Sequence, residues 1–461
     1  MSDRWRLGKQ LESIVSSDRV FPEDRIAARY RFDALRPYRP YPKLRMRGYT
    51  PTFLVEPENT SEVSEIVRIA HRSHTPIVPY GGGTGLMGAA VAVQGGIMVD
   101  TSRMDEIEEI SAEDLFVRAQ SGVVLESIHN RLQDLNLFFA HDPWTRPIAT
   151  LGGAIATNSL GYLGAKYGSI GDQLLGIEAV LPDGLIMKTR PAQFSSTGFD
   201  LKRLFVGTEG CYGLITSATV RAFPEPEKSA LASYHFSSFE QGYRAIVAMR
   251  MSNVGPSMID YGEESASGHA QLNMAFDGLE NEVKAQLAKA DAITAESGGK
   301  KLDDKEAQEF WDHRHDVALM YSRRISATIL HEEPRTRYDY LHLSLPASKI
   351  LGFREDALRI AKDNRVNVLD VGLWHGPELL SLVLSSRASD AQAAAKKLWN
   401  ASDLILRHGQ DLGGCMEYCH GVGLRLAHLM KREHGLGLEI MRGFKRTVDP
   451  LGIMNPGKAA L

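Results

Sequence analysis

Short apolar runs and one amphipathic stretch organise the beginning of the chain. The runs typical of strands are residues 52–56, 75–80 and 95–100. Between the first two, Asn59 precedes a stretch, 61–73, whose apolar positions recur at helical spacing. The pattern predicts a strand, a helix capped by Asn59 and a second strand, followed by a glycine-rich turn and a third strand.

Strand-like runs continue along the first half of the chain. They occupy residues 115–122, 176–184, 185–189 and 213–223, and a helical pattern at 123–136 interrupts them. The sequence LPDG between two of these runs is a hairpin signal. The first half is therefore predicted to be α+β.

The segment PEPEK at 224–228 separates a second region with longer elements. Amphipathic helices are predicted at 276–297, 389–409 and 424–447, and strands at 230–236, 338–345, 366–373 and 379–385. The strand at 338–345 places His342 on one of its two alternating faces. This region is predicted to form a second α+β domain.

Residues 1–50 are charged and rich in Arg, Tyr and Pro, and no regular element is predicted there. Two interpretations remain open for them. The segment is either a solvated arm, or it lies across a cofactor phosphate or a partner subunit.

Composition narrows the class of protein. A length of 461 residues favours two or three domains, and 43% hydrophobic and 24% charged residues are typical of globular chains. A net charge of −4 gives no overall excess of positive charge for binding nucleic acid. Three cysteines exclude a disulfide framework or a four-cysteine cluster. No apolar run reaches 18 residues and the start has no signal-like apolar region, so a cytoplasmic protein without a transmembrane segment is expected.

The glycines are the most informative residues of the first half. Residues 83–88 match G-x-G-x-x-G, but the following segment, 89–96, is too short for the helix that a Rossmann dinucleotide site requires. Four glycines within 81–85 still leave backbone N–H groups bare, which suits an anion-binding nest. Two further clusters, 149–168 and 205–216, are similarly rich in small residues and suit a wall for a flat ring system.

Three such clusters in this order resemble the flavoprotein family of vanillyl-alcohol oxidase and p-cresol methylhydroxylase. Within that family, the chain resembles the glycolate oxidase subunit and the D-lactate and D-2-hydroxyacid dehydrogenases. The motifs that carry the resemblance are PYGGGTGLMG (79–88), ATLGGAIATNSLGYLGAKYGSIGDQLLGIEAVLPDG (149–184), TGFDLKRLFVGTEGCYGLIT (197–216), CHGVG (419–423) and VDPLGIMNPGK (448–458). They cover almost the whole chain.

The resemblance implies an α+β fold with a two-subdomain FAD-binding domain at 1–228. It implies an α+β cap, or substrate, domain at 229–423 and a C-terminal return at 424–461 that completes the FAD site. The family binds FAD, in some members through a covalent histidine link. The first glycine loop contains no histidine, so we expect noncovalent FAD.

The resemblance also assigns cofactor residues. Backbone amides of one loop would hold the pyrophosphate: Gly81, Gly82, Gly83, Thr84 and Gly85, next to Pro79. The ribityl and ring region would be lined by Pro143, Thr150, Gly152, Gly153, Thr157 and Asn158, extended by Gly161 and Tyr162. The adenine–ribose side would meet Glu209, Gly213 and Ile215, and Asn455 would reach the flavin from the C-terminal turn.

Four residues are catalytic candidates. His420 matches the family histidine before Gly-Val-Gly, and a histidine suits a base that works near neutral pH. Arg314 matches a family Trp-x-x-Arg and would either clamp a substrate carboxylate in a bidentate manner or form a surface salt bridge with Asp312 or Asp316. Arg425 would neutralise a substrate anion or reduced flavin, and His375 lies in the stretch where the hydroxyacid dehydrogenases carry metal ligands.

That metal motif is broken in this chain. The His-to-His spacing of G-H-x-G-D-G-N-x-H is absent at 372–381, and Cys419 occupies the position of the family glutamate. The simpler expectation is no metal, although an unusual set of His375, Glu378 and His420 stays open.

The expected activity is an FAD-dependent oxidation of a secondary alcohol, most simply a small 2-hydroxyacid-like substrate. The alternatives are an alkyl transferase resembling alkylglycerone-phosphate synthase, an alcohol or phenol oxidase of the same fold, a flavoprotein subunit that needs a partner, and an NAD-dependent Rossmann enzyme. Neither the electron acceptor nor the oligomeric state can be derived from the residues. A homodimer is common among the relatives.

Overall fold

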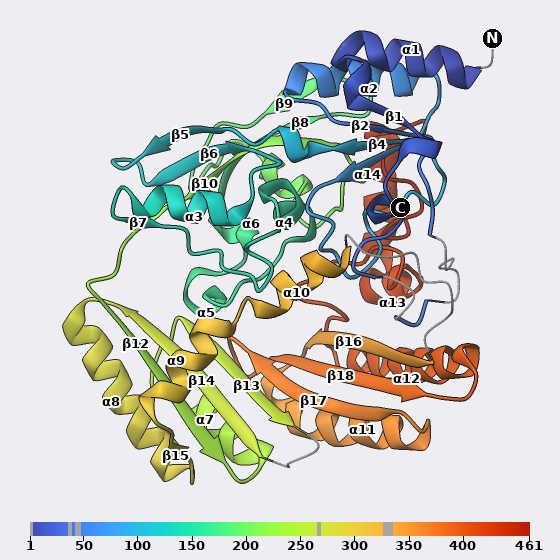
Figure 1. The fold of residues 1–461 in the computed structure, drawn as a ribbon. Coiled ribbons are helices and arrows are strands. Elements are labelled where there is room, and N and C mark those ends of the chain that lie inside the picture. Colours follow the sequence, from blue (N-terminus) through green and yellow to red (C-terminus); the bar gives the residue numbers. More distant parts are fainter. Residues whose placement is uncertain (1–2, 36–38, 42–47, 265–268, 326–334) are drawn as a thin grey trace.

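The structure is a computed structural model that describes residues 3–35, 39–41, 48–264, 269–325 and 335–461. Figure 1 shows two bodies, one above the other, with the C-terminal segment returning to the upper body. The mixture of helices and antiparallel and parallel strands confirms the predicted α+β class. Among the described helices, none is long and apolar enough to cross a membrane.

The upper body begins with a four-stranded sheet. Its order is β1 (Val20–Pro22), β2 (Phe53–Val55), β4 (Ile97–Asp100) and β3 (Ile77–Tyr80). Helix α2 (Thr60–Arg72) connects two of these strands, and the Asn59 side chain accepts a hydrogen bond from the Glu62 N–H, as expected of an N-cap. Strands β3 and β4 are parallel neighbours, yet the chain between them forms no helix, as predicted.

A second, antiparallel sheet completes the upper body. Its order is β5 (Ile107–Ser111), β6 (Phe116–Gln120), β10 (Leu214–Arg221), β8 (Leu174–Val180) and β9 (Ile186–Lys188). Its helices are α3 (Leu125–Gln133), α4 (Leu151–Thr157), α5 (Gly164–Tyr167) and α6 (Ile170–Gln173), and β7 (Leu137–Phe138) pairs with β11 (Phe223–Pro224). The LPDG hairpin between β8 and β9 is confirmed.

The lower body is built on one seven-stranded antiparallel sheet. Its order is β15 (Lys300–Lys301), β12 (Lys228–Phe236), β14 (Ala270–Gly278), β13 (Met258–Glu264), β17 (Asn367–Trp374), β18 (Leu379–Arg387) and β16 (Thr336–Ser344). The helices of this body are α7 (Phe239–Met251), α8 (Glu280–Glu296), α9 (Asp304–His313), α10 (Asp316–Ile325), α11 (Ile350–Asp363) and α12 (Ala391–Asp411). In Figure 1, α10 lies between the two bodies.

The C-terminal return differs from the single helix predicted at 424–447. The structure has α13 (Met430–His434) and α14 (Leu436–Val448), separated at Gly435 with φ +51°, a left-handed value that a continuous helix cannot contain. After α14, the chain runs beside β3: the Ile77 N–H donates to the Ile453 carbonyl at 2.8 Å. The return therefore covers an edge of the upper sheet.

The N-terminal segment is more regular than the sequence suggested. Helix α1 (Asp3–Val15) packs on α2 and buries Leu11 and Val15, because its few apolar residues face one side. The predicted helix at 276–297 also begins later, at Glu280, since the first of its residues belong to β14. The domain limits at 228 and 423 stay a proposal, to which the start of β12 at Lys228 lends support.

A buried carboxylate joins three distant parts of the chain. Asp339 of β16 accepts from the Arg39 Nε at 3.0 Å and is also paired with Arg425. Burial by itself raises the pKa of Asp339, but the two guanidinium groups hold it below its ordinary value. The N-terminal segment, the lower sheet and the C-terminal return thus meet at one ionised group.

Replacing Arg425 by Met should therefore destabilise the fold. Removing one partner of a buried ion pair leaves an uncompensated charge and costs about 3 kcal/mol or more. We expect a lower midpoint of urea unfolding, followed by tryptophan fluorescence. The matched control is Arg244→Met, whose exposed pair with Glu240 should change stability by less than about 1 kcal/mol. An equal effect of both substitutions would contradict this role of Arg425.

Candidate functional site

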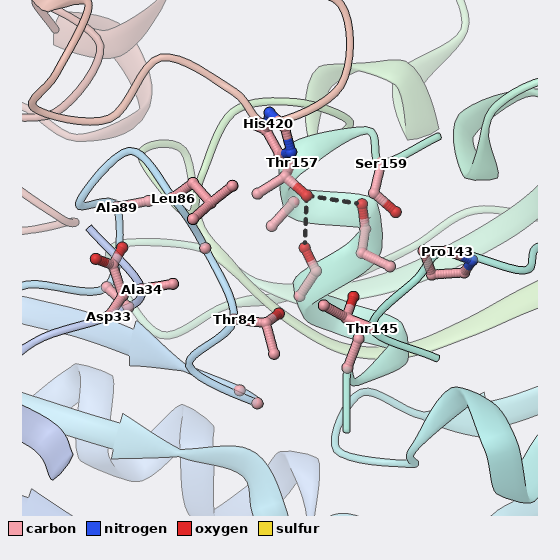
Figure 2. Close-up of a pocket in the computed structure, with 18 of the residues that line it drawn as sticks. Asp33, Ala34, Thr84, Leu86, Ala89, Pro143, Thr145, Thr157, Ser159 and His420 are labelled. Atoms are coloured by element: carbon pink, nitrogen blue, oxygen red, sulfur yellow. Dashed lines mark hydrogen bonds between the residues drawn. The ribbon is translucent and has the colours of Figure 1, made fainter. Parts of the chain in front are cut away.

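A cavity of about 990 Å³ lies between the glycine-rich loops of the upper body and the lower sheet. Most of the predicted site residues line it: Pro79, Gly81, Gly82, Gly83, Thr84, Gly85, Pro143, Thr150, Gly152, Gly153, Thr157, Tyr162, Glu209, Gly213, Ile215, Arg314 and His420. Figure 2 shows segments from opposite sides of this cavity, with Asp33, Leu86 and Ala89 on one side and Pro143 and Thr145 on the other. Residues far apart in sequence therefore share one concave site.

The first glycine loop is packed directly against the second glycine-rich segment. A Cβ on Gly82 would collide with the Ile148 carbonyl oxygen, and one on Gly81 with the Thr150 hydroxyl. Among the described residues, we find no acceptor for the backbone N–H groups of 81–85. The loop therefore lines the cavity with free backbone donors, as an anion-binding nest requires.

The second segment is ordered by local capping. The Thr150 side chain accepts from the Gly153 N–H at the start of α4, and a Cβ on Gly152 would strike Ser121 at 2.6 Å. Asn158 and Gly161 are not among the cavity-lining residues. The Asn158 side chain instead accepts from the Gly171 N–H at 3.2 Å, and Gly161 permits close approach to the Asp142 backbone. Both residues therefore make contacts within the segment that carries the lining residues and do not line the cavity themselves.

Glu209 connects the third glycine cluster to the C-terminal return. Its carboxylate accepts from the backbone N–H groups of Val422 and Gly423, both at 2.8 Å. Burial raises the pKa of Glu209 to about 7, despite these two hydrogen bonds. Asn455, which lies outside the cavity lining, donates to the Glu209 carbonyl at 2.6 Å. The predicted adenine-side role of Glu209 stays a prediction, and its observed contacts are with the loop that follows His420.

His420 lies in the cavity at the end of a segment that extends the lower sheet. Residues 415–417 pair with the edge strand β16, through bridges between Ser344 and Cys415 and between His342 and Glu417. The Glu417 carboxylate then accepts from the backbone N–H of His420 at 3.0 Å. This arrangement fixes the histidine loop against β16.

The Nδ1 side of the His420 ring faces two side chains. Cys419 Sγ lies 3.3 Å from Nδ1 and a Glu417 oxygen lies 3.5 Å from it. Although burial raises the pKa of Glu417, the His420 ring lowers it below its ordinary value, so Glu417 is a carboxylate. Burial raises the pKa of the Cys419 thiol well above its ordinary value.

Strand β16 contributes a second face to the cavity. Tyr338, Tyr340 and His342 alternate along the strand and all line the cavity, which confirms the predicted alternation. The His342 and His420 ring centroids are 4.3 Å apart. Burial, together with the nearby His420, lowers the pKa of His342 to about 3, so that its ring is neutral.

Arg314 reaches the cavity with part of its guanidinium already engaged. Its Nε donates to Asp142 at 2.9 Å and its Nη1 to the Trp311 carbonyl. Burial raises the pKa of Asp142, but His315 and two arginines more than offset this and hold it below its ordinary value. A bidentate clamp through both outer nitrogens is therefore not available. Nη2 is the nitrogen without a partner among the described residues.

The structure does not bring Arg425 and His375 into the cavity. Arg425 is fully buried and lies over the Trp399 ring, 4.4 Å from its centroid. The sequence predicted that Arg425 contacts a substrate anion. In the structure its guanidinium pairs with Asp339 instead. His375 is not among the lining residues, although its ring lies 6.0 Å from that of Trp374, which is one of them, and Glu378 pairs with Arg250. Among the described residues, neither is grouped with His420 in a metal-like cluster.

Sequence reasoning missed several residues of the site. Asp33 and Arg39 line the cavity, which favours the interpretation of the N-terminal stretch as a segment across the site. Burial raises the pKa of Asp33 to about 6. Tyr321 and Met320 of α10 complete the lining. The arginine and tyrosine content of 1–50 was the one available signal, because no local pattern reveals which distant segment a residue will face.

FAD fits the residues present on two observations of this structure. The loop 81–85 offers unpaired backbone donors suited to a pyrophosphate, and adding a Cβ at Gly81 or Gly82 would force the loop away from its neighbour. The bare wall at Gly152 and Gly153 leaves room for a flat ring. The same cavity continues to His420.

Comparison with known proteins agrees with this geometry. Residues 51–190 match the FAD binding domain family, and residues 225–459 match the family described as FAD linked oxidases, C-terminal domain. The chain is 28% identical to a probable mitochondrial D-lactate dehydrogenase of Danio rerio, covering 88% of this chain and 84% of that protein. It is 29% identical to glycolate oxidase subunit GlcD of Bacillus subtilis, covering 88% of each.

Solved structures share the fold at lower identity. An alkyldihydroxyacetonephosphate synthase superimposes with a TM-score of 0.78 at 20% identity, covering 98% of this chain and 84% of that one. p-Cresol methylhydroxylase with substrate bound superimposes with a TM-score of 0.78 at 16% identity, covering 100% and 98%. These likenesses concern the fold, whereas the family matches extend along both bodies. The chain therefore belongs to the FAD-linked oxidases, and it is an FAD-dependent oxidoreductase of the D-lactate dehydrogenase and glycolate oxidase type.

Proposed function

We propose that this protein binds FAD noncovalently and oxidises the secondary alcohol of a small 2-hydroxyacid-like substrate, with His420 as the base. The observation that carries the proposal is the place of His420: its ring lies in the cavity that the glycine loops line, with Nδ1 facing Glu417 and Cys419. The relatives named as D-lactate dehydrogenase and glycolate oxidase subunit support the substrate class.

The glycine loops would hold the cofactor. Backbone N–H groups of 81–85 would bind the pyrophosphate, and Thr150, Gly153 and Thr157 would line the ribityl and ring region. Pro143 and Tyr162 would extend that wall, and Gly213 and Ile215 would close the other end. When bound, FAD supplies the two-electron acceptor that alcohol oxidation needs.

His420 would take the proton of the substrate hydroxyl. A Glu417 carboxylate near Nδ1 favours the tautomer that has its proton on Nδ1, which leaves the lone pair of Nε2 for the substrate. His342, which is neutral and packed against the His420 ring, would fix the ring orientation without adding charge. The histidine is thus held in one tautomer, as general-base catalysis requires.

The carboxylate of the substrate would meet Arg314. Two of its nitrogens are held by Asp142 and the Trp311 carbonyl, so the guanidinium is oriented before substrate binds. Nη2 would donate a single charge-assisted hydrogen bond. The tyrosines Tyr338 and Tyr340 line the same cavity and would provide neutral walls.

Noncovalent attachment makes a direct prediction. The histidines among the described lining residues are His342 and His420, and both belong to the β16 side rather than to the first glycine loop. Precipitation of the purified holoprotein with acid should release all yellow colour into the supernatant. Flavin that remains in the protein pellet after denaturing washes would refute this part of the proposal.

A methyl group on the first glycine loop should weaken FAD binding. In Gly82→Ala the new Cβ meets the Ile148 carbonyl, and relieving such overpacking costs about 1–3 kcal/mol, or roughly a 5- to 150-fold loss of affinity. The matched control is Gly352→Ala in α11, where a Cβ finds open space. We expect the control to keep the visible flavin absorbance per chain, and an unchanged FAD affinity of Gly82→Ala would argue against the assigned loop.

The proposed reaction is tested by anaerobic bleaching of the flavin absorbance with a panel of 2-hydroxyacids. We expect one acid to reduce the wild-type flavin. The same acid should reduce His420→Gln about 10²- to 10⁴-fold more slowly, with FAD content unchanged, because the base is lost. The control His313→Gln changes an exposed histidine outside the cavity lining and should react at the wild-type rate.

Other outcomes of the same experiment select other functions. If no hydroxyacid bleaches the flavin but a phenol or an uncharged alcohol does, the protein is an alcohol or phenol oxidase of this fold. Turnover of an alkyl donor without net bleaching would indicate alkyl transfer instead. Rates that are equal in wild type and His420→Gln would remove the histidine from the mechanism.

A further inference from the structure

A cluster of four potential metal ligands surrounds the His420 ring. His342, Glu417, Cys419 and His420 each offer one ligand atom, and these atoms all lie within 4.8 Å of one another. The cluster differs from the set considered from the sequence, since it contains neither His375 nor Glu378. It combines β16 with the 415–420 segment, which pair through the bridge between His342 and Glu417.

From this geometry we propose that His342, Glu417, Cys419 and His420 form a binding site for a zinc-class divalent cation, and that its occupation switches off the base function of His420. The effect on the base function of His420 rests on the function proposed above. The cation site itself rests on the cluster alone.

The distances are close to those of a formed site. With Zn–N near 2.0 Å and Zn–S near 2.3 Å, neighbouring ligand atoms of a tetrahedral site lie roughly 3.4 Å apart. His420 Nδ1 already lies 3.3 Å from Cys419 Sγ and 3.5 Å from a Glu417 oxygen. The remaining ligand atoms lie within 4.8 Å of one another, so they would have to move closer together to complete a tetrahedral site.

The polar groups of the cluster also have spare bonding capacity. The His342 Nδ1 is buried without a hydrogen-bond partner among the described residues, an unusual state for a ring nitrogen inside a protein. Glu417 is anchored by the backbone N–H groups of Cys419 and His420, both at 3.0 Å, so one of its oxygens is oriented in advance. A cation would satisfy the histidine and neutralise the carboxylate.

The ligand types select the class of metal. Two imidazoles, one thiol and one carboxylate suit Zn²⁺ and similar transition ions, whereas Mg²⁺ and Ca²⁺ require oxygen ligands. On binding, the Cys419 thiol would release its proton to solvent and bind as thiolate. No oxidant or reductant is involved.

Occupation of the site would change the His420 tautomer. A neutral imidazole carries one proton, and a metal at Nδ1 requires that proton to reside on Nε2. The nitrogen proposed to accept the substrate proton would then be a donor. Zinc should therefore inhibit the oxidation reversibly rather than support it.

The test begins with the FAD-loaded protein, incubated with Zn²⁺ and desalted. We expect about one bound zinc per chain, and a zinc X-ray absorption spectrum with a sulfur neighbour at about 2.3 Å. Cys419→Ser should lose the sulfur neighbour and bind zinc at least about tenfold more weakly in competition with a chromophoric chelator, since even loss of an outer-shell partner costs 10- to 100-fold. His342→Gln is a second variant that should weaken binding without touching the thiol.

The matched control is Cys415→Ser, which removes an exposed cysteine of the same segment outside the cluster. It should bind zinc as the wild type does. Wild-type binding that equals that of Cys419→Ser, or a spectrum without sulfur, would overturn the site.

A second experiment measures the rate at which the substrate that bleaches the flavin does so with and without Zn²⁺. Inhibition of the wild type that a chelator reverses, and that is absent in Cys419→Ser, supports the switch. Zinc binding with an unchanged bleaching rate overturns it. The binding measurements need no substrate, so failure of the proposed oxidation would leave their result standing.

Discussion

The carboxylate of Asp339 holds the molecule together where its three segments converge. Arg39 comes from the N-terminal segment and Arg425 from the C-terminal return, and both pair with this one group on β16. A buried ion triad adds little net stability relative to an apolar core of the same volume, since desolvation offsets most of the Coulomb attraction. It does penalise every arrangement in which one charge is left alone. The triad therefore specifies which segments meet and in which register.

That register places the functional groups. Because Asp339 points to the buried side of β16, its neighbours Tyr338 and Tyr340 face the cavity. Arg425 follows the His420 loop closely in sequence, so its anchoring also limits where His420 can lie. Glu209 adds a second anchor by accepting from Val422 and Gly423. The imidazole is thus positioned by contacts on both sides of its own loop.

The cavity has two walls of different chemistry. The upper wall is rich in glycines, and the backbone donors of residues 81–85 suit phosphate. The lower wall carries ionisable side chains, including His342 and His420. When one wall of a pocket binds the cofactor and the other carries the reactive side chains, a single fold can host different reactions. In this chain that wall also carries Cys419, whose Sγ lies 3.3 Å from the His420 Nδ1.

The sequence by itself determined the features that depend on local pattern. The helix after Asn59, the hairpin at LPDG and the helix-free turn after β3 all follow from residues within a few positions of one another, and the glycine motifs identified the cofactor class. Only the tertiary structure decided the rest. It broke the helix predicted at 424–447 at Gly435, buried Arg425 against Asp339, and brought His342 beside Glu417 and Cys419. The burial of Arg425 and the meeting of His342 with Glu417 and Cys419 depend on contacts between segments far apart in the chain, whose energies arise from burial and charge pairing that no local periodicity records.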